Sequence, residues 1–297
     1  MRINEWQKHG KKVRILDKDI FYLKFGRAKE TLCILHGFPT SSHDFYKIIE
    51  PLSSRFTVIL HDHPGFGFSQ KPVNYSYSLI EQAEAALALY KKLGIKKAHF
   101  LAHDYGTSVM TEILARREIS GIDIDVQSLT LCNGSLHIEL ANLRLVQVLL
   151  RLRVLGPLVA RLSNLKFFKL QMKSLWVNKS LLSEEELDDM WFALNYNEGA
   201  RVLPLISRYL YERSKFWHRW IGALTRLDIP VHILWAQLDP VSVPAIGNQL
   251  AEEIPRSVYT RLENLGHYPM LESPERFIFA ADDFYNHLKP LPGRRRK

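Results

Sequence analysis

The segment between residues 98 and 116 changes abruptly from strand character to helix character. Residues 98–102 form an apolar run typical of a buried strand, and residues 108–116 are compatible with a helix. Between them, Ala102 and Gly106 flank Asp104, the pattern of a sharp turn that lifts its central side chain above a sheet. Small flanking residues are needed because such a turn crowds the neighbouring strand and helix. The segment therefore favours folds in which strands lead directly into helices.

The same alternation of strand and helix continues along the chain. A continuous apolar run at residues 31–35 is typical of a strand buried on both faces of a parallel sheet, and residues 58–60, 126–132 and 231–235 have strand character as well. An edge hairpin at residues 13–23, a last strand at 257–261 and a terminal helix at 274–288 complete the pattern. Strands that alternate with helices at this spacing predict right-handed βαβ units, and hence an α/β fold with a mostly parallel sheet.

The alternation is interrupted once. Residues 137–221 have a helical pattern rich in leucine, arginine, tryptophan and tyrosine, with no convincing strand, before strand character returns at residue 231. No internal repeat or low-complexity linker separates this part from the rest. The sequence therefore predicts one α/β core, made of residues 1–136 and 222–297, with a helical cap at residues 137–221 inserted into it.

The composition favours a core-forming protein without a cofactor. Nearly half of the 297 residues are apolar, and no nucleic-acid-binding motif accompanies the net charge of +9, so nucleic acid is not an expected partner. Cys33 and Cys132 lie in apolar runs and are expected to be buried thiols, and no Cys/His spacing typical of a metal site is present. The first residues form no apolar targeting segment, which makes the cytoplasm the expected location.

Asp104 is the candidate nucleophile, although a buried aspartate that merely ends a strand is the alternative interpretation. A carboxylate is ionised at neutral pH without a general base, and it suits attack at a saturated carbon that carries a leaving group. Enzymes with this kind of turn place an acid and then a histidine on later loops. Asp239 follows the strand at 231–235, and His267 follows the strand at 257–261. The other position used for the acid, after the strand at 126–132, holds Asn133, so Asp239 is preferred.

Four motifs in the chain resemble the epoxide hydrolase and haloalkane dehalogenase branch of the α/β-hydrolases. They are His-Gly-Phe-Pro-Thr-Ser-Ser at 36–42, Gly-Phe-Gly-Phe-Ser at 65–69, His-Asp-Tyr-Gly at 103–106 and Gly-His-Tyr-Pro at 266–269, and the match spans roughly residues 12–288. The resemblance implies an α/β-hydrolase fold with an inserted helical cap and a catalytic triad of Asp104, Asp239 and His267.

The resemblance also implies a mechanism. Backbone N–H groups of Phe38 and Tyr105 would form the oxyanion hole, and a cis peptide bond before Pro39 would aim the Phe38 amide inward. The Asp104 carboxylate would displace the leaving group and form an alkyl-enzyme ester. His267 would then activate a water molecule that hydrolyses this ester.

Assistance to the leaving group distinguishes the two activities of this branch. An epoxide oxygen needs an acid, which the resemblance implies is a cap tyrosine. Tyr209 is the closest positional match, with Tyr211 and Tyr196 as alternatives, and each could instead be a packed aromatic residue. A halide is usually bound by a tryptophan directly after the nucleophile and by an asparagine in the His-Gly-x-Pro motif. Because these positions hold Tyr105 and Phe38, epoxide hydrolysis is favoured over haloalkane dehalogenation.

The cap sequence leaves other classes of function open. Residues 143–175 mix apolar residues with basic ones, a composition that can lie on an anionic membrane surface as a peripheral contact. The basic residues are Arg144, Arg151, Arg153, Arg161, Lys166, Lys169 and Lys173. The same composition suits a lid over an active site, and both interpretations favour a small lipophilic substrate, with water as the second reactant. A non-catalytic binding protein is a third possibility, against which the Asp-Asp-His set argues, and the oligomeric state stays open.

Overall fold

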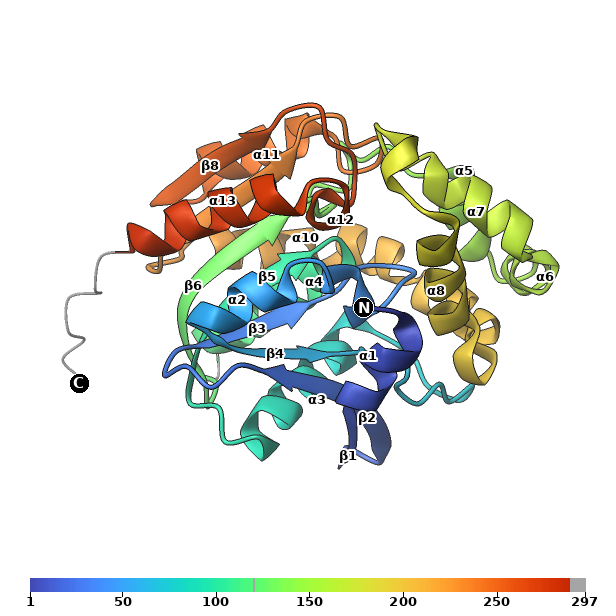
Figure 1. The fold of residues 1–297 in the computed structure, drawn as a ribbon, viewed down its shortest axis with the longest axis horizontal. Helices are drawn as coiled ribbons and strands as arrows, with labels where there is room; N and C mark the ends of the chain where they lie inside the picture. Colours follow the sequence, from blue (N-terminus) through green and yellow to red (C-terminus); the bar gives the residue numbers. More distant parts are fainter. Residues whose placement is uncertain (120, 289–297) are drawn as a thin grey trace.

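The computed structural model describes residues 1–119 and 121–288, which form an eight-stranded sheet flanked by helices (Figure 1). The strand order is β1-β2-β4-β3-β5-β6-β7-β8. β2 pairs antiparallel with β1 and β4, and all other neighbouring strands are parallel. This arrangement confirms the predicted α/β fold with a mostly parallel sheet. The strands are β1 (Lys11–Ile15), β2 (Lys18–Phe25), β3 (Thr31–Leu35), β4 (Thr57–His61), β5 (Lys97–His103), β6 (Asp125–Cys132), β7 (Val231–Ala236) and β8 (Ser257–Leu262).

The central parallel strands end level with one another. Leu35 of β3 lies opposite Ala102 of β5, and His103 of β5 lies opposite Cys132 of β6. The loops that follow these three strands therefore leave the sheet at the same edge. In open α/β sheets this carboxyl edge is where ligands bind.

Helices cover both faces of the sheet. In Figure 1, α2 and α13 lie in front of it, whereas α3, α4 and α10 lie behind it. The terminal helix predicted at 274–288 is observed as α13. Outside the insertion the helices are α1 (Ile3–His9), α2 (Ile49–Arg55), α3 (Leu79–Lys92), α4 (Tyr105–Ile119), α11 (Pro244–Glu253), α12 (Pro269–Glu272) and α13 (Pro274–Asn286), with one 3-10 helix, η1 (Ser42–Phe45).

The described residues between β6 and β7 form helices and no strand. They are α5 (Leu145–Leu150), α6 (Leu155–Leu162), α7 (Leu165–Lys173), η2 (Lys179–Leu181), α8 (Glu184–Asn195), η3 (Tyr196–Val202), α9 (Leu203–Ile206) and α10 (Tyr209–Thr225). Helices α5 to α8 gather at one end of the molecule, on the right in Figure 1.

The last helix of the insertion packs on the core. Glu112 of α4 accepts hydrogen bonds from Arg219 at 2.8 Å and from the indole N–H of Trp220 at 2.8 Å, both on α10. The predicted cap boundary at residue 221 therefore falls inside a helix that lies along α4. A helical pattern alone does not distinguish a cap helix from a core helix, because both bury one face.

The described residues lack membrane-spanning helices and clusters of metal ligands. Within 1–119 and 121–288, no helix is long and apolar enough to cross a membrane. The described part of the chain also contains no group of His, Cys, Asp or Glu side chains arranged to hold a metal ion. Cys33 and Cys132 are buried free thiols.

Candidate active site

Asp104 occupies a sharp turn between β5 and α4. Its φ angle of +44° lies in the left-handed region, which residues other than glycine rarely adopt. A Cβ atom added at Gly106 would lie only 2.4 Å from the carbonyl oxygen of Leu35 on β3. The helix therefore approaches the neighbouring strand as closely as a glycine permits. This explains the small residue predicted after the aspartate.

The loop after β3 brings a backbone donor to this carboxylate. The Phe38 N–H donates to Oδ2 of Asp104 at 2.9 Å, and the Phe38–Pro39 peptide bond is cis, as predicted. Tyr105 is the first residue of α4, where backbone N–H groups have no intrahelical partner. A Cβ atom at Gly37 would lie 3.0 Å from the Cβ of Asp104, so this loop needs a glycine to approach the turn.

His36 holds the loops after β3 and β4 together. Its Nδ1 lies 2.8 Å from the carbonyl oxygen of Gly37, and its Nε2 accepts the backbone N–H of His63 at 3.1 Å. Burial lowers the pKa of His36 and outweighs the attraction of Asp62, so the ring is neutral. A neutral ring with its proton on Nδ1 satisfies both contacts. The first residue of the His-Gly-Phe-Pro motif thus supports the loop that carries the Phe38 N–H.

The loops after β7 and β8 bring the predicted acid and histidine together. Nδ1 of His267 lies 2.7 Å from Oδ2 of Asp239, and both side chains are almost fully buried. Oδ1 of Asp239 accepts the backbone N–H groups of Val241 at 2.8 Å and Ser242 at 3.0 Å. The acid is therefore fixed by its own loop.

Asn133 occupies the alternative acid position after β6 and contacts Asp239 directly. Its Nδ2 donates to Oδ2 of Asp239 at 2.7 Å, and its Oδ1 accepts the backbone N–H of Ala236 at 3.0 Å. The residue after β6 therefore orients Asp239. No spacing in the sequence indicated this contact, since it joins residues on two different loops.

The charges of the pair shift both pKa values. Burial opposes the positive charge on His267, but the attraction of Asp239, their hydrogen bond and the charges of Asp104 and Asp44 outweigh it and raise the pKa of His267. Burial likewise opposes ionisation of Asp239. The charge of His267 and the hydrogen bonds that Asp239 accepts outweigh this effect and lower the pKa of Asp239. The neighbouring His103 is different, because burial lowers its pKa to about 4.

The loop that carries His267 is joined to the cap. The backbone N–H of His267 donates to the carbonyl oxygen of Leu175 at 2.9 Å, and Leu175 lies just after α7. The carboxylate of Glu272 accepts the N–H groups of Gly266 at 2.8 Å and Asn178 at 2.7 Å. A Cβ atom at Gly266 would lie 2.2 Å from the Leu175 carbonyl oxygen, which explains the glycine before the histidine.

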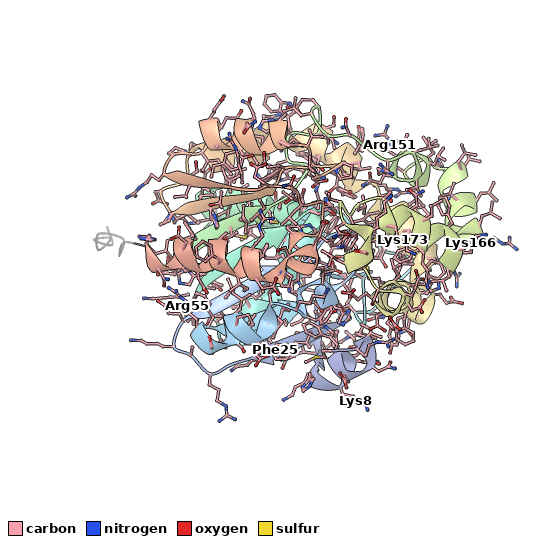
Figure 2. The ribbon with its side chains drawn as sticks, turned by 45° about the horizontal axis from the view of Figure 1, so that its top comes forward. Lys8, Phe25, Arg55, Arg151, Lys166 and Lys173 are labelled. Carbon is pink, nitrogen blue, oxygen red and sulfur yellow. The ribbon has the colours of Figure 1, made fainter. Side chains whose placement is uncertain are left out.

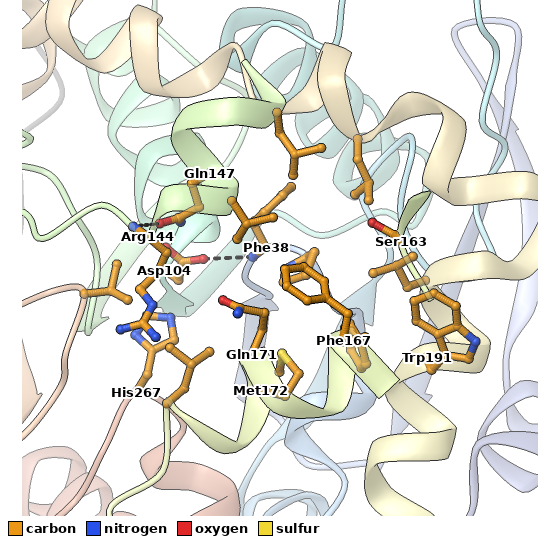
Figure 3. A pocket seen from close by; sticks show the side chains of 18 residues that line it. Phe38, Asp104, Arg144, Gln147, Ser163, Phe167, Gln171, Met172, Trp191 and His267 are labelled. Atoms are coloured by element: carbon orange, nitrogen blue, oxygen red, sulfur yellow. Dashed lines mark hydrogen bonds between the residues drawn. The ribbon is translucent and has the colours of Figure 1, made fainter. Parts of the chain in front are cut away.

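Asp104 and His267 line one cavity of about 90 Å³ between the sheet edge and the cap. Figure 3 shows Asp104 and His267 on one side of this cavity and Phe167 and Trp191 on the other. Most of the lining is apolar, and Arg144, Gln147, Ser163, Gln171 and Trp191 supply the polar groups of the cap. The other lining residues are Phe38, Pro39, Val146, Leu150, Phe168, Met172, Leu175, Leu194, Leu203 and Val241.

The three predicted cap tyrosines lie in different surroundings, and none of them lines this cavity. Tyr211 is 64 % exposed, and Tyr196 packs edge-on against Phe68 with ring centroids 4.9 Å apart. The structure therefore does not bring these two to the site, and Tyr196 is the packed aromatic residue that the alternative interpretation expected.

Tyr209 lies closer to the site, behind the oxyanion loop. Its ring centroid is 5.8 Å from that of Phe38 and 5.0 Å from that of Tyr105. Its hydroxyl is buried beside the side chain of Gln147, which lines the cavity. Burial raises the pKa of Tyr209, so the hydroxyl keeps its proton at neutral pH. Of the three tyrosines, only Tyr209 packs against a residue that lines the cavity next to Asp104.

One charged residue beside the turn did not emerge from the sequence. Arg213 of α10 is 1 % exposed, and its Nε donates to the hydroxyl of Ser108 at 2.6 Å. Its Nη2 donates to the backbone carbonyl oxygen of Asp104 at 3.2 Å and lies 4.0 Å from Oδ1 of the same residue. An arginine in a helical pattern is usually a surface residue. No sequence signal distinguished this one from the others in the insertion.

Known proteins with similar sequences cover almost the whole chain. The human mesoderm-specific transcript homolog protein is 37 % identical over 294 residues, covering 96 % of this chain and 88 % of its own length. LipZ of Mycobacterium tuberculosis, whose name includes the word hydrolase, is 35 % identical over 279 residues, covering 94 % of this chain and 96 % of its own length.

Solved structures share the fold at lower sequence identity. Haloalkane dehalogenase DbeA from Bradyrhizobium elkani has a TM-score of 0.79 and 23 % identity, covering 93 % of this chain and 97 % of its own. An esterase from Thermogutta terrifontis has a TM-score of 0.74 and 20 % identity, covering 95 % of this chain and 99 % of its own. The family described as the alpha/beta hydrolase fold matches residues 30–274. With the sheet, the turn at Asp104 and these relatives in agreement, this chain belongs to the α/β-hydrolase fold family.

Proposed function

We propose that the chain is a hydrolase that uses Asp104 as its nucleophile and acts on small lipophilic epoxides through a covalent ester. One observation carries the proposal. The Asp104 carboxylate accepts the Phe38 N–H and lines the same cavity as His267, which is paired with Asp239. A nucleophile, a backbone donor and an oriented base around one cavity are the groups that two-step hydrolysis requires.

In the first step, an oxygen of the Asp104 carboxylate attacks a ring carbon of the epoxide. A C–O bond forms, the ring C–O bond breaks, and the released oxygen takes a proton from a donor. Attack by Oδ1 leaves Oδ2 on the Phe38 N–H, where it becomes the carbonyl oxygen of the ester. No base is needed in this step, because the carboxylate is already charged.

In the second step, His267 accepts a proton from a water molecule, and the resulting hydroxide attacks Cγ of Asp104. Negative charge develops on Oδ2, which the Phe38 N–H already contacts and which the unpaired N–H at the start of α4 can also stabilise. The bond from Cγ to the alkyl oxygen then breaks, and this oxygen takes the proton from His267. The carboxylic acid that remains returns its proton to the donor used in the first step, so the products are a diol and the regenerated carboxylate.

The cavity supports the choice of a lipophilic substrate. Apolar side chains such as Leu150, Phe168 and Met172 make up most of its lining, which favours an apolar molecule that carries one reactive group. The donor to the epoxide oxygen is assigned to Tyr209, whose hydroxyl keeps its proton and lies beside the side chain of Gln147, a residue of the cavity wall. The amides of Gln147 and Gln171 line the cavity and are the alternative donors.

A turnover screen tests this function. Wild-type protein and the Asp104→Ala variant are incubated with epoxides, haloalkanes and carboxylic esters of matched chain length, and each product is measured. We expect diol formation from at least one lipophilic epoxide by the wild type and none by the variant. Ester hydrolysis that survives in Asp104→Ala, without any epoxide turnover, would contradict the proposal.

A further inference from the structure

The outer surface of the cap exposes an unusual number of large apolar side chains. Nine of the 23 strongly exposed ones among the described residues fall between positions 145 and 170. Leu145 is 71 %, Val154 81 % and Leu162 66 % exposed. We call the following set the cap face: Leu145, Leu152, Val154, Leu155, Leu158, Leu162, Leu165, Phe167 and Leu170. Apolar groups concentrated in this way indicate a surface that binds something.

Helix α6 shows that this exposure is built into the cap. Its small residues Gly156 and Ala160 are buried, whereas Leu155, Leu158 and Leu162 are exposed. The spacing of three and four places these leucines on one side of the helix. Ordinary surface helices bury their leucines and expose polar residues. This helix does the opposite, so the exposed side is adapted to an apolar or interfacial environment.

Most of the basic side chains around the cap face form no ion pair with the described residues. No aspartate or glutamate occurs between Glu139 and Glu184. The described residues form no ion pair with the exposed side chains of Arg151, Arg153, Arg161 and Lys166, whereas Lys169 and Lys173 pair with Glu184. Figure 2 shows Arg151, Lys166 and Lys173 on the cap helices, away from the sheet. Positive charge around protruding leucines complements a surface that is apolar inside and negatively charged at its edge.

We infer that the cap face binds the surface of an anionic lipid bilayer. The leucines of α6 and α7 enter the boundary between headgroups and acyl chains, and the arginines and lysines contact the phosphates. A second copy of the chain is less suitable, because two such faces would place like charges opposite each other.

The same surface adjoins the candidate active site. Phe167 lines the cavity of Asp104 and His267, and it also lines an outer groove with Leu165, Lys166 and Leu170. A molecule dissolved in the bilayer would therefore meet the wall of the cavity first. Binding to the bilayer itself depends on the cap face alone and is independent of the reaction assigned to Asp104.

Co-sedimentation with vesicles tests the inference. The full chain is mixed with vesicles of phosphatidylcholine alone or with about 30 % phosphatidylserine, at about 50 mM and about 500 mM salt. We expect the protein to pellet only with the anionic vesicles at low salt. Failure to pellet with them, or equal binding to neutral vesicles, would overturn the inference.

Two sets of variants separate the apolar and the charged contributions. Leu158→Ser with Leu162→Ser, and separately Arg151→Glu with Arg153→Glu, should each weaken binding at least tenfold. Matched controls elsewhere on the surface are Leu16→Ser with Phe279→Ser, and Arg27→Glu with Lys29→Glu; these should bind like the wild type. Circular dichroism verifies that every variant is folded.

The controls also address the other occupants of this surface. Equal losses of vesicle binding in the cap variants and the control variants would contradict binding through the cap face. Sedimentation velocity is measured in parallel without lipid. A dimer that disappears in the Leu158→Ser and Leu162→Ser variant, without vesicle binding by the wild type, would assign the face to self-association and overturn the inference.

Discussion

The guanidinium of Arg213 contacts the backbone of Asp104 and lies beside its carboxylate. Nη2 donates to the carbonyl oxygen of Asp104 at 3.2 Å and is 4.0 Å from Oδ1, and both residues are buried. Arg213 also donates a hydrogen bond from Nε to the hydroxyl of Ser108 at 2.6 Å. A helix of the insertion thus places a positive charge at the turn that carries the proposed nucleophile. Buried pairs of this kind are sensitive to the loss of either partner.

Replacement of Arg213 should slow the first chemical step. In the His267→Gln background, Arg213→Met removes the charge and the contact with the turn, and we expect ester formation at least tenfold slower. Arg213→Lys keeps the charge, so its rate of ester formation should lie between those of the proteins with arginine and with methionine at this position. Intact-protein mass measured against time gives the rate. Equal rates in a folded Arg213→Met protein would show that Arg213 serves stability only.

The pKa of His267 should depend on the charge of Asp104. Asp104 is one of the acidic groups that raise this pKa, so Asp104→Asn removes a stabilising charge from the imidazolium and should lower the pKa. An NMR titration of labelled histidines measures it, with Asp239→Asn as the variant expected to lower it as well. His103, whose pKa is about 4, provides an internal reference that stays neutral above pH 6.

This shift has a consequence for the reaction. Ester formation neutralises Asp104, so His267 loses one source of its raised pKa when it must act as a base. Because the neutral ring is the base, hydrolysis of the ester should slow as the pH falls through the pKa of His267. A pKa that is unchanged in Asp104→Asn would show that the two groups do not interact.

Tyr209→Phe should slow epoxide opening by about two orders of magnitude, the lower range for loss of a general acid. The change removes only the hydroxyl, so the packing against Phe38 and Tyr105 is kept. Gln171→Met is the matched comparison in the cavity wall. Single-turnover formation of the ester is the measurement. If Gln171→Met is slow and Tyr209→Phe is normal, the amide rather than the tyrosine is the donor.

Haloalkane turnover should be weak or undetectable. The positions usually used for halide donors hold Phe38 and Tyr105, and the hydroxyl of Tyr105 is buried outside the cavity. Trp191 lines the cavity but lies across it from Asp104 (Figure 3). Halide release from 1-bromobutane and 1,2-dibromoethane is the test. A rate on the order of 1 per second or more would be normal for an enzyme and would overturn this prediction.

The sequence predicted those features that depend on neighbouring residues. The turn at Asp104 follows from an apolar run, a small residue and a helix in direct succession. The cis bond before Pro39 and the positions of Asp239 and His267 after their strands follow from local motifs in the same way. Each of these signals lies within about ten residues, the range over which backbone preferences act.

The supporting contacts could not be predicted, because they join distant parts of the chain. Arg213 contacts Ser108, which lies 105 positions earlier in the chain, and Asn133 contacts Asp239, which lies 106 positions later. Both side chains are common on protein surfaces, so only the folded chain distinguishes them. For the same reason the sequence left Tyr211 and Tyr196 as alternatives to Tyr209, although only Tyr209 packs against a residue next to Asp104.

The ester that Asp104 is proposed to form, and that His267 is proposed to hydrolyse, can be detected by its mass. The His267→Gln variant is incubated with a substrate identified in the screen, and its intact mass and peptide map are recorded. We expect one substrate molecule to add its full mass to the protein, on a peptide that contains Asp104. Hydrolysis of this ester should be about two to four orders of magnitude slower than in the wild type. Asp104→Ala with His267→Gln should take up no mass. Normal turnover by His267→Gln, or an adduct on another residue, would contradict the assignment of Asp104 as the nucleophile and His267 as the base.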